Sequence, residues 1–151
     1  MKTIKEVFDY LDTINDVYDM RYDNCKMESY ASSDNWYKEI LKEVLKLEPI
    51  PKRIVDVGSN LNQFAYMFVN EGIDYIGIDL WNAGRCMKPL ENEHIKFIGA
   101  NYEDIAEFYK DDVLISNLCV GYVIKQEKVK AKHFIKGTLD KDGKANATKV
   151  W

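Results

Sequence analysis

The sequence has few of the residues that build metal and disulfide sites. Its 151 residues contain three cysteines, Cys25, Cys86 and Cys119, and two histidines, His94 and His133. An odd number of widely spaced cysteines without a C-x-x-C pair argues against a disulfide framework and a zinc knuckle. The isolated histidines exclude a zinc site of the H-E-x-x-H type. We therefore expect no metal site and a reducing compartment, where unpaired cysteines persist.

Long apolar runs are also absent from the sequence. The opening MKTIKEVFDYLD is charged throughout and has no apolar signal segment. No apolar run approaches the roughly 18 residues that are needed to span a bilayer. These absences predict a soluble, cytoplasmic protein without a membrane partner.

The chain has no overall excess of positive charge. It carries 21 lysine and arginine residues against 25 aspartate and glutamate residues, a net charge of -4, which disfavours polyanion binding by the whole molecule. Lysines gather in residues 125–151, but aromatic residues do not interleave with them in the pattern that stacks bases. We interpret this segment as a solvated surface, so the sequence does not favour nucleic acid as a partner.

Apolar residues are plentiful enough for one hydrophobic core. They make up 46% of the chain, and 13% of the residues are aromatic. We expect a single domain over residues 1–151, with an N-terminal helical segment in 1–50 and an α/β core in 53–151.

Helical spacing of apolar residues dominates the first part of the chain. It predicts one helix from Ile4 to beyond Val17, and a second from Trp36 to Leu47. Pro49 follows directly and is expected to end the second helix.

After the prolines, short apolar runs alternate with helical patterns. We predict strands at residues 54–57, 75–80, 95–98 and 113–116, and helices at 61–70 and 102–109. Strands that are apolar on both faces and alternate with helices indicate a doubly wound, mainly parallel sheet. Residues 134–139 and 144–151 flank an Asp-Gly turn and predict an antiparallel hairpin at the sheet edge.

The loop after the first predicted strand is the first place to look for a ligand. In a doubly wound sheet, ligands bind beyond the carboxyl ends of the strands, near the point where strand order reverses. A dinucleotide site would carry G-x-G-x-x-G there. The run from Gly58 is GSNLNQ, which lacks the later glycines, so a nicotinamide dehydrogenase is disfavoured.

Four segments together resemble a known family. Residues 55–60, VDVGSN, resemble motif I of the class I S-adenosylmethionine-dependent methyltransferases, with Asp56 placed before Gly58 as in that motif. The segments YIGID, FIGANYED and DDVLISN are similar to the family's next three motifs and follow in the same order. The resemblance covers about residues 53–117. It implies a Rossmann-like fold and S-adenosylmethionine as the cofactor.

The resemblance also implies which residues hold the cofactor. The implied cofactor-binding residues are Asp56, Gly58, Ser59, Asn60, Asp79, Asn101 and Tyr102, and the implied catalytic residue is Asn117, facing the methyl group. Asp79 would hold the ribose hydroxyls, and Asn101 or Tyr102 would lie near adenine.

Each of these residues also has a structural interpretation. Asp56 could bond loop amides, Asp79 and Asn101 could cap the segments that follow them, and Asn117 could satisfy backbone groups at a strand end. Trp36 and Tyr30 stand where a lid over the cofactor could lie, although aromatic residues at helical spacing are more often core residues.

Two features depart from the family pattern. Asn60 and Asn62 replace later glycines, although asparagine tolerates left-handed backbone angles. The chain after Asn117 is short for the family, which leaves three explanations: a minimal substrate site, one supplied by the N-terminal helices, or a piece of a longer enzyme. The sequence thus predicts a methyltransferase of unknown acceptor, with a degenerate, non-catalytic binding or regulatory module as the alternative.

Overall fold

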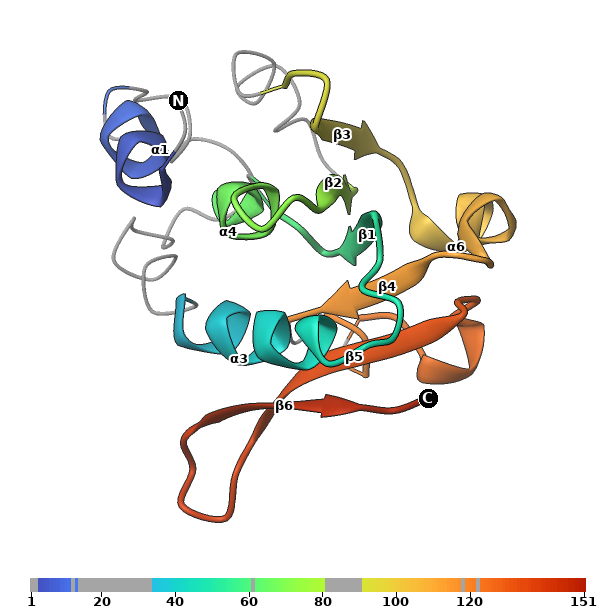
Figure 1. The fold of residues 1–151 in the computed structure, drawn as a ribbon. Helices are drawn as coiled ribbons and strands as arrows, with labels where there is room; N and C mark the ends of the chain where they lie inside the picture. The colour runs from blue at the N-terminus through green and yellow to red at the C-terminus, as the bar shows by residue number, and fades with distance from the viewer. Residues whose placement is uncertain are drawn as a thin grey trace.

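The computed structural model describes residues 3–11, 13, 34–60, 62–80, 91–117, 119–121 and 123–151. A six-stranded sheet in the order β3-β2-β1-β4-β5-β6 runs through it (Figure 1). The strands are β1 (Arg53–Val57), β2 (Asp74–Asp79), β3 (Ile95–Gly99), β4 (Val113–Ser116), β5 (His133–Leu139) and β6 (Ala145–Lys149). All neighbouring strands are parallel except β5 and β6, which are antiparallel. The predicted doubly wound sheet and its edge hairpin are confirmed.

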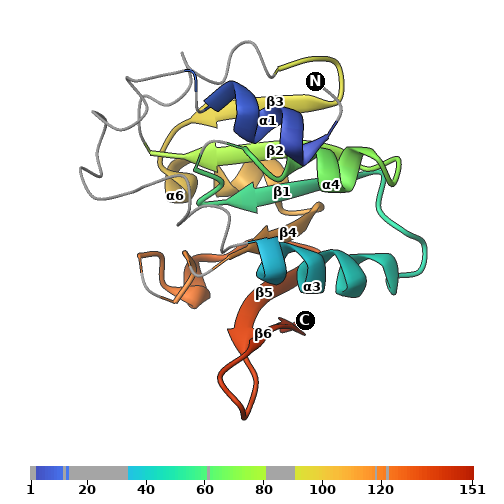
Figure 2. The same cartoon turned by 90° about the vertical axis from the view of Figure 1, so that its left-hand side faces the viewer.

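Helices cover both faces of the sheet (Figure 2). They are α1 (Ile4–Leu11), α3 (Asp34–Leu45), α4 (Ala65–Val69), α6 (Tyr102–Ile105) and the 3-10 helices η3 (Ala106–Tyr109) and η4 (Gln126–Lys128). Helix α3 packs on β5 and β6, α4 packs on β2, and α1 packs on α4. Helix α6 lies on the opposite face (Figure 1).

The strands form because their apolar side chains are buried on both faces. In β1, Ile54 packs into the cluster under α3 and α4, whereas Val55 packs into the cluster under α6, and both are fully buried. Burial of such a side chain contributes about 1.5–3 kcal/mol. This alternation fixes the register of the strand, since a slip by one residue would exchange the two faces.

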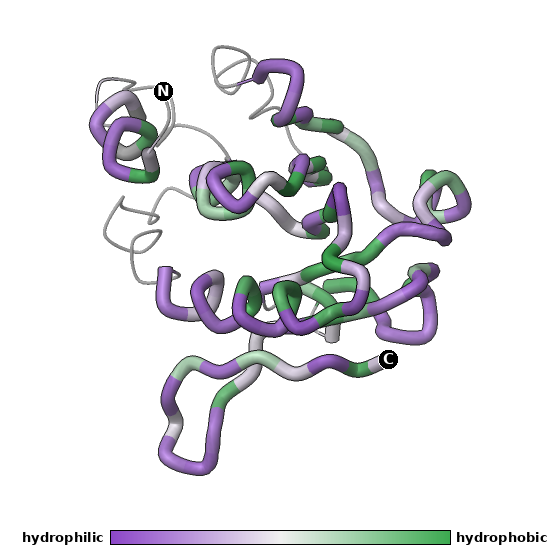
Figure 3. Tube along the Cα trace, viewed as in Figure 1, coloured by the Kyte–Doolittle hydropathy of each residue, from purple (hydrophilic) through white to green (hydrophobic). Residues whose placement is uncertain are grey.

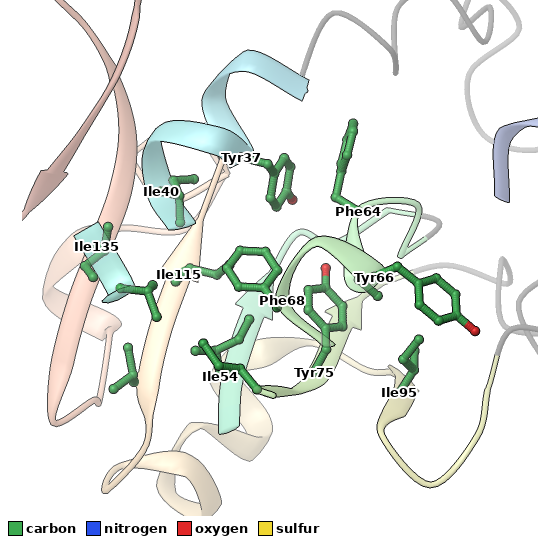
Figure 4. Packing of buried hydrophobic residues seen from close by; sticks show 14 of the residues in the cluster. Tyr37, Ile40, Ile54, Phe64, Tyr66, Phe68, Tyr75, Ile95, Ile115 and Ile135 are labelled. Atoms are coloured by element: carbon green, nitrogen blue, oxygen red, sulfur yellow. The ribbon is translucent and has the colours of Figure 1, made fainter. Parts of the chain in front are cut away.

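Helix α3 attaches the N-terminal segment to the sheet. Its buried face consists of Tyr37, Ile40 and Val44, at helical spacing. The Tyr37 ring stacks on Phe64 at 4.5 Å between centroids (Figure 4). The prediction of this helix is confirmed, and α1 confirms the start of the first predicted helix, whose later residues lie outside the described ranges.

Two predicted helices are shorter or less regular than expected. The helix predicted over residues 61–70 begins only at Ala65, because Asn62 has a left-handed φ of 54° that no α-helix accepts. The helix predicted over 102–109 is one α-helical turn followed by a 3-10 turn.

The predicted hairpin pairs Thr138 with Asn146, and its connecting turn is hydrophilic (Figure 3).

The chain order reverses at the centre of the sheet. Strand β1 pairs with β2 on one side and with β4 on the other. The loops that leave the carboxyl ends of β1 and β4 therefore diverge, and a crevice between such loops is where doubly wound proteins bind ligands.

Candidate functional site

The loop after β1 keeps its tight turn although it has only one glycine. Gly58, Asn60 and Asn62 have φ angles of 78°, 52° and 54°. Asparagine supports this left-handed geometry better than other residues with a side chain. The N–H groups of Gly58 and Ser59 both donate to the carbonyl of Ile78, at 2.8 and 3.2 Å. The loop is thereby fastened to the end of β2.

Asp79 also holds this loop. Its Oδ2 accepts a hydrogen bond from the N–H of Asn60 at 2.8 Å, and its Oδ1 accepts one from the N–H of Leu80 at 2.7 Å. A carboxylate has about four lone-pair sites. Asp79 therefore caps the loop after β1, which was not predicted, as well as the residue that follows it, and it still has acceptor capacity for a ligand.

Gly77 allows the loop to lie flat on β2. A Cβ atom at this position would be 1.9 Å from Oδ1 of Asn62 and 2.6 Å from Oγ of Ser59. At the other end of the loop, a Cβ at Gly58 would be 2.4 Å from Cβ of Cys119. The loop thus fills the space beside Gly77, and Cys119, in the segment after β4, fills the space beside Gly58.

A cavity of about 410 Å³ lies at the carboxyl ends of the central strands. It is within the usual range of 300–1,000 Å³ for small-molecule sites. Six of the eight predicted site residues line it: Gly58, Asn60, Asp79, Asn101, Tyr102 and Asn117. The structure thus brings together residues that are far apart in the sequence.

The other two predicted residues, Asp56 and Ser59, do not line this cavity. Asp56 is completely buried, and its Oδ2 accepts hydrogen bonds from the hydroxyls of Tyr37, at 2.7 Å, and Tyr75. Tyr37 belongs to α3 and Tyr75 to β2, and their rings are labelled in Figure 4. Burial raises the pKa of Asp56 to about 7, and the tyrosine hydrogen bonds oppose that rise. Asp56 thus joins three elements beneath the loop.

Asn101 and Tyr102 combine structural contacts with a place in the cavity wall. The Asn101 side chain accepts a hydrogen bond from the N–H of Glu103 at 3.1 Å and so caps α6. The Tyr102 hydroxyl accepts a bond from the N–H of Lys130 at 3.0 Å and donates to the same residue's carbonyl. The two hydrogen bonds of Tyr102 connect the segment after β3 to the segment before β5, and so fix this part of the cavity wall.

Asn117 and Trp36 both approach Gly137 of β5. A Cβ at Gly137 would lie 2.6 Å from Oδ1 of Asn117 and 2.9 Å from Cδ1 of Trp36. The indole N–H of Trp36 donates to the carbonyl of Thr138 at 3.0 Å. Trp36 does not line the cavity but a separate groove of about 760 Å³, and Tyr30 lies outside the described residues.

The charges of the cavity wall are of one sign. Asp79 and Glu103 line it, and no lysine, arginine or histidine does so in the described ranges. Burial raises the pKa of the Cys119 thiol to about 11, so the thiol stays protonated near neutral pH. No group of three or more metal-ligating side chains occurs within the part of the chain that the structure describes. Because both charged residues of the described wall are acidic, the wall suits a cationic ligand better than a phosphate.

Sequence reasoning missed several residues of this site. Gly77 carried a usable signal, because a glycine inside a strand often marks a close approach of other groups. Cys119, Glu103 and Val123 also line the cavity, but nothing in their sequence context distinguishes them. Tyr37 was expected only as a position in a helix, and its hydrogen bond to Asp56 depends on the tertiary fold.

Comparison with solved structures identifies the fold. The plantazolicin methyltransferase BpumL, in complex with a pentazolic desmethylPZN analog and S-adenosylhomocysteine (SAH), matches with a TM-score of 0.60 and 19% identity over 92% of this chain. The chain has a methyltransferase fold. A protein assigned as an antibiotic-pathway methyltransferase from Anabaena variabilis has a TM-score of 0.52 and 15% identity over 72% of this chain and 48% of its own.

The methyltransferase fold recurs in a third protein. A protein from Listeria monocytogenes, assigned as an S-adenosylmethionine-dependent methyltransferase, has a TM-score of 0.50 and 17% identity, covering 72% of this chain and 64% of its own. The chain spans 62% of the length of BpumL. No protein-family model and no curated protein matches the sequence. None of the described helices is both apolar enough and long enough to cross a membrane.

Proposed function

We propose that the cavity binds S-adenosylmethionine and that the protein transfers its methyl group to an acceptor. The observation that carries this proposal is the position of Asp79. Its carboxylate lies in the wall of the cavity at the end of β2 and is fixed by the N–H of Asn60 and of Leu80. A fixed carboxylate with free lone pairs suits the two hydroxyls of a ribose.

The character of the wall supports this ligand over a dinucleotide. A pyrophosphate would need basic side chains or a glycine-rich loop, and the described wall has neither. S-adenosylmethionine carries a positive sulfonium, which the acidic wall favours. Oδ1 of Asn60 is buried without a hydrogen-bond partner in the described structure and could accept a hydrogen bond from the methionyl amine.

The chemistry asks little of the protein beyond orientation. The cofactor supplies a methyl group on a good leaving group, and the residues of the wall position it for in-line attack. We assign Gly58 and Asn60 to the methionyl part and Asp79 to the ribose. We assign Asn101 and Tyr102 to the adenine region and Asn117 to the region of the methyl group.

The test is calorimetric titration of SAH into an Asp79→Ala variant. We expect its affinity to fall more than tenfold, because the ribose loses its acceptor and Asn60 loses its support. Asp74→Ala is the matched control, since Asp74 begins the same strand and lies away from the cavity. An unchanged affinity in the Asp79→Ala variant would remove the ribose assignment.

The alternative is a non-catalytic module that keeps the methyltransferase architecture. It is favoured by Asn60, whose side chain stands in the cavity wall where the family pattern has a glycine, whereas Asn62 packs against Gly77 and does not line the cavity. This alternative predicts a folded protein that binds neither S-adenosylmethionine nor SAH.

A further inference from the structure

One side chain of the cavity wall and one of the groove wall converge above Gly137. Asn117 lines the cavity, and Trp36 lines the groove between α1, α3 and the hairpin. Both side chains converge on the same point above Gly137, from 2.6 and 2.9 Å. A molecule in the groove that displaced the Trp36 indole would therefore reach the region assigned to the methyl group.

Asn117 lacks a hydrogen-bond donor at this contact. Its Oδ1 is buried and has no hydrogen-bond partner among the described residues. A buried acceptor that receives no hydrogen bond is destabilising. A ligand that brings an N–H or O–H group to this position would recover that free energy.

An amine fits this position better than a hydroxyl group. A hydroxyl must lose its proton to a base as it attacks. The described cavity wall has no histidine, and the Cys119 thiol stays protonated near neutral pH. Of the two carboxylates, Asp79 is assigned to the ribose, and Glu103 belongs to α6 in the region assigned to adenine. A neutral amine attacks with its own lone pair and needs no such base.

The groove indicates the rest of the acceptor. Ile4, Leu41, Leu45 and Met67 give it an apolar lining. Lysines 38, 42 and 144 also line it, with Glu39 as the acidic member. Lys38 and Lys42 are paired with Asp34 and Glu39, whereas no ion pair joins Lys144 to a described residue. An apolar chain with a negative charge complements this lining.

The distance along the hairpin sets the length of that chain. The Trp36 indole donates a hydrogen bond to Thr138, and Thr138 pairs with Asn146 of β6. Lys144 lies two positions before Asn146, in the turn that precedes β6. At about 3.3 Å per residue, Lys144 is roughly 7 Å further along the strand. A tripeptide, at most about 10 Å long when extended, spans that distance.

We propose that the groove binds the methyl acceptor, and that the acceptor is an apolar peptide with a free amino terminus at Trp36 and Asn117 and a carboxylate near Lys144. This inference rests on the proposed function. In the transfer, the nitrogen lone pair forms the N–C bond while the C–S bond breaks with its electrons going to sulfur, which becomes a neutral thioether. The resulting ammonium group releases a proton to water.

The experiment uses the whole chain and three tripeptides. SAH is titrated first, and Phe-Leu-Leu, its N-acetyl form and its C-terminal amide are then titrated into SAH-saturated protein. We expect binding of Phe-Leu-Leu and at least fivefold weaker binding of the amide. When S-adenosylmethionine is supplied, one methyl group should be added to Phe-Leu-Leu and, at higher concentration, to the amide, but none to the N-acetyl form.

Variants test the two ends of the groove. Lys144→Gln should weaken binding of Phe-Leu-Leu at least fivefold without changing binding of the amide. Trp36→Ala should weaken binding of neither peptide, because it removes the indole that the peptide must displace. Lys141→Gln is the matched control, because Lys141 is an exposed lysine of the same turn and does not line the groove. SAH affinity should stay unchanged in the two lysine variants.

The outcomes separate the two proposals. SAH binding without any peptide binding, or equal binding of the acid and the amide, overturns the acceptor assignment and leaves the cofactor assignment standing. A folded protein that does not bind SAH overturns both.

Discussion

The substitution Gly77→Ala tests whether the loop after β1 is seated on β2. Gly77 is paired with Asp56 in the centre of the sheet, and ordinary strand geometry accepts alanine. The added Cβ would nevertheless lie 1.9 Å from Oδ1 of Asn62, where contacts of 3.4 Å or more are ordinary. Asn62 would have to move by about 1.5 Å to restore van der Waals contact.

This movement has a cost that the structure allows us to estimate. Asn62 is only 2% exposed, and its Nδ2 donates to the carbonyl of Lys96 at 3.2 Å. Overpacking costs about 1–3 kcal/mol, and a lost hydrogen bond costs about 1 kcal/mol more. Replacing a strand glycine by alanine returns about 0.5–1 kcal/mol. We expect the free energy of unfolding to fall by about 2–3 kcal/mol.

Urea unfolding and SAH titration measure the two consequences. Gly77→Ala should lower the free energy of unfolding and weaken SAH binding, because the displaced loop carries Gly58 and Asn60. The double variant Gly77→Ala, Asn62→Gly should recover at least half of the lost stability, since glycine accepts the φ of 54° and removes the nearest clashing atom. A single variant as stable as the parent, with unchanged SAH affinity, would refute the seating of the loop.

Three further predictions concern Asp56 and Cys119. Burial raises the pKa of Asp56 to about 7 from 3.8, so its protonated form stabilises the fold below about pH 4 and that stability is lost as pH rises through 7. Asp56→Asn should flatten this part of the stability–pH profile, and an unchanged slope would assign it to other groups. Tyr37→Phe should destabilise the protein by about 1–3 kcal/mol in urea, because a bond to a buried carboxyl is lost; a neutral effect would mean that the bond contributes nothing. Cys119, with its pKa raised to about 11 by burial, should react slowly with iodoacetamide at pH 7.5 and more slowly with SAH present, as site-resolved mass spectrometry would show; labelling at the rate of a free thiol would contradict both its burial and its place in the cavity.

The sequence was sufficient to predict the sheet because its signals are local. Strands such as Val113–Ser116 are short apolar runs that are buried on both faces, and the hairpin has an Asp-Gly turn between two strands. The start of α4 was predicted wrongly, because Asn62 follows the helical pattern but adopts a left-handed backbone. Tertiary contacts with Gly77 and Lys96 hold it there, and no local pattern encodes them.

The candidate site was predictable where residues follow directly on strand ends. Asp79 and Asn117 stand at the carboxyl ends of β2 and β4, and topology alone brings such positions together. The burial of Asp56 by Tyr37 and Tyr75 could not be predicted, because it depends on how α3 crosses the sheet. The same is true of Trp36, whose position is fixed by Thr138 in a strand far along the chain.

Calorimetric titration of the folded protein with S-adenosylmethionine and with SAH, with NAD as the control, tests the central claim most directly. The account predicts micromolar binding of both methyltransferase ligands and no binding of NAD, because the wall is acidic and the loop after β1 lacks the glycines for a pyrophosphate. A folded sample that binds neither S-adenosylmethionine nor SAH would contradict the account.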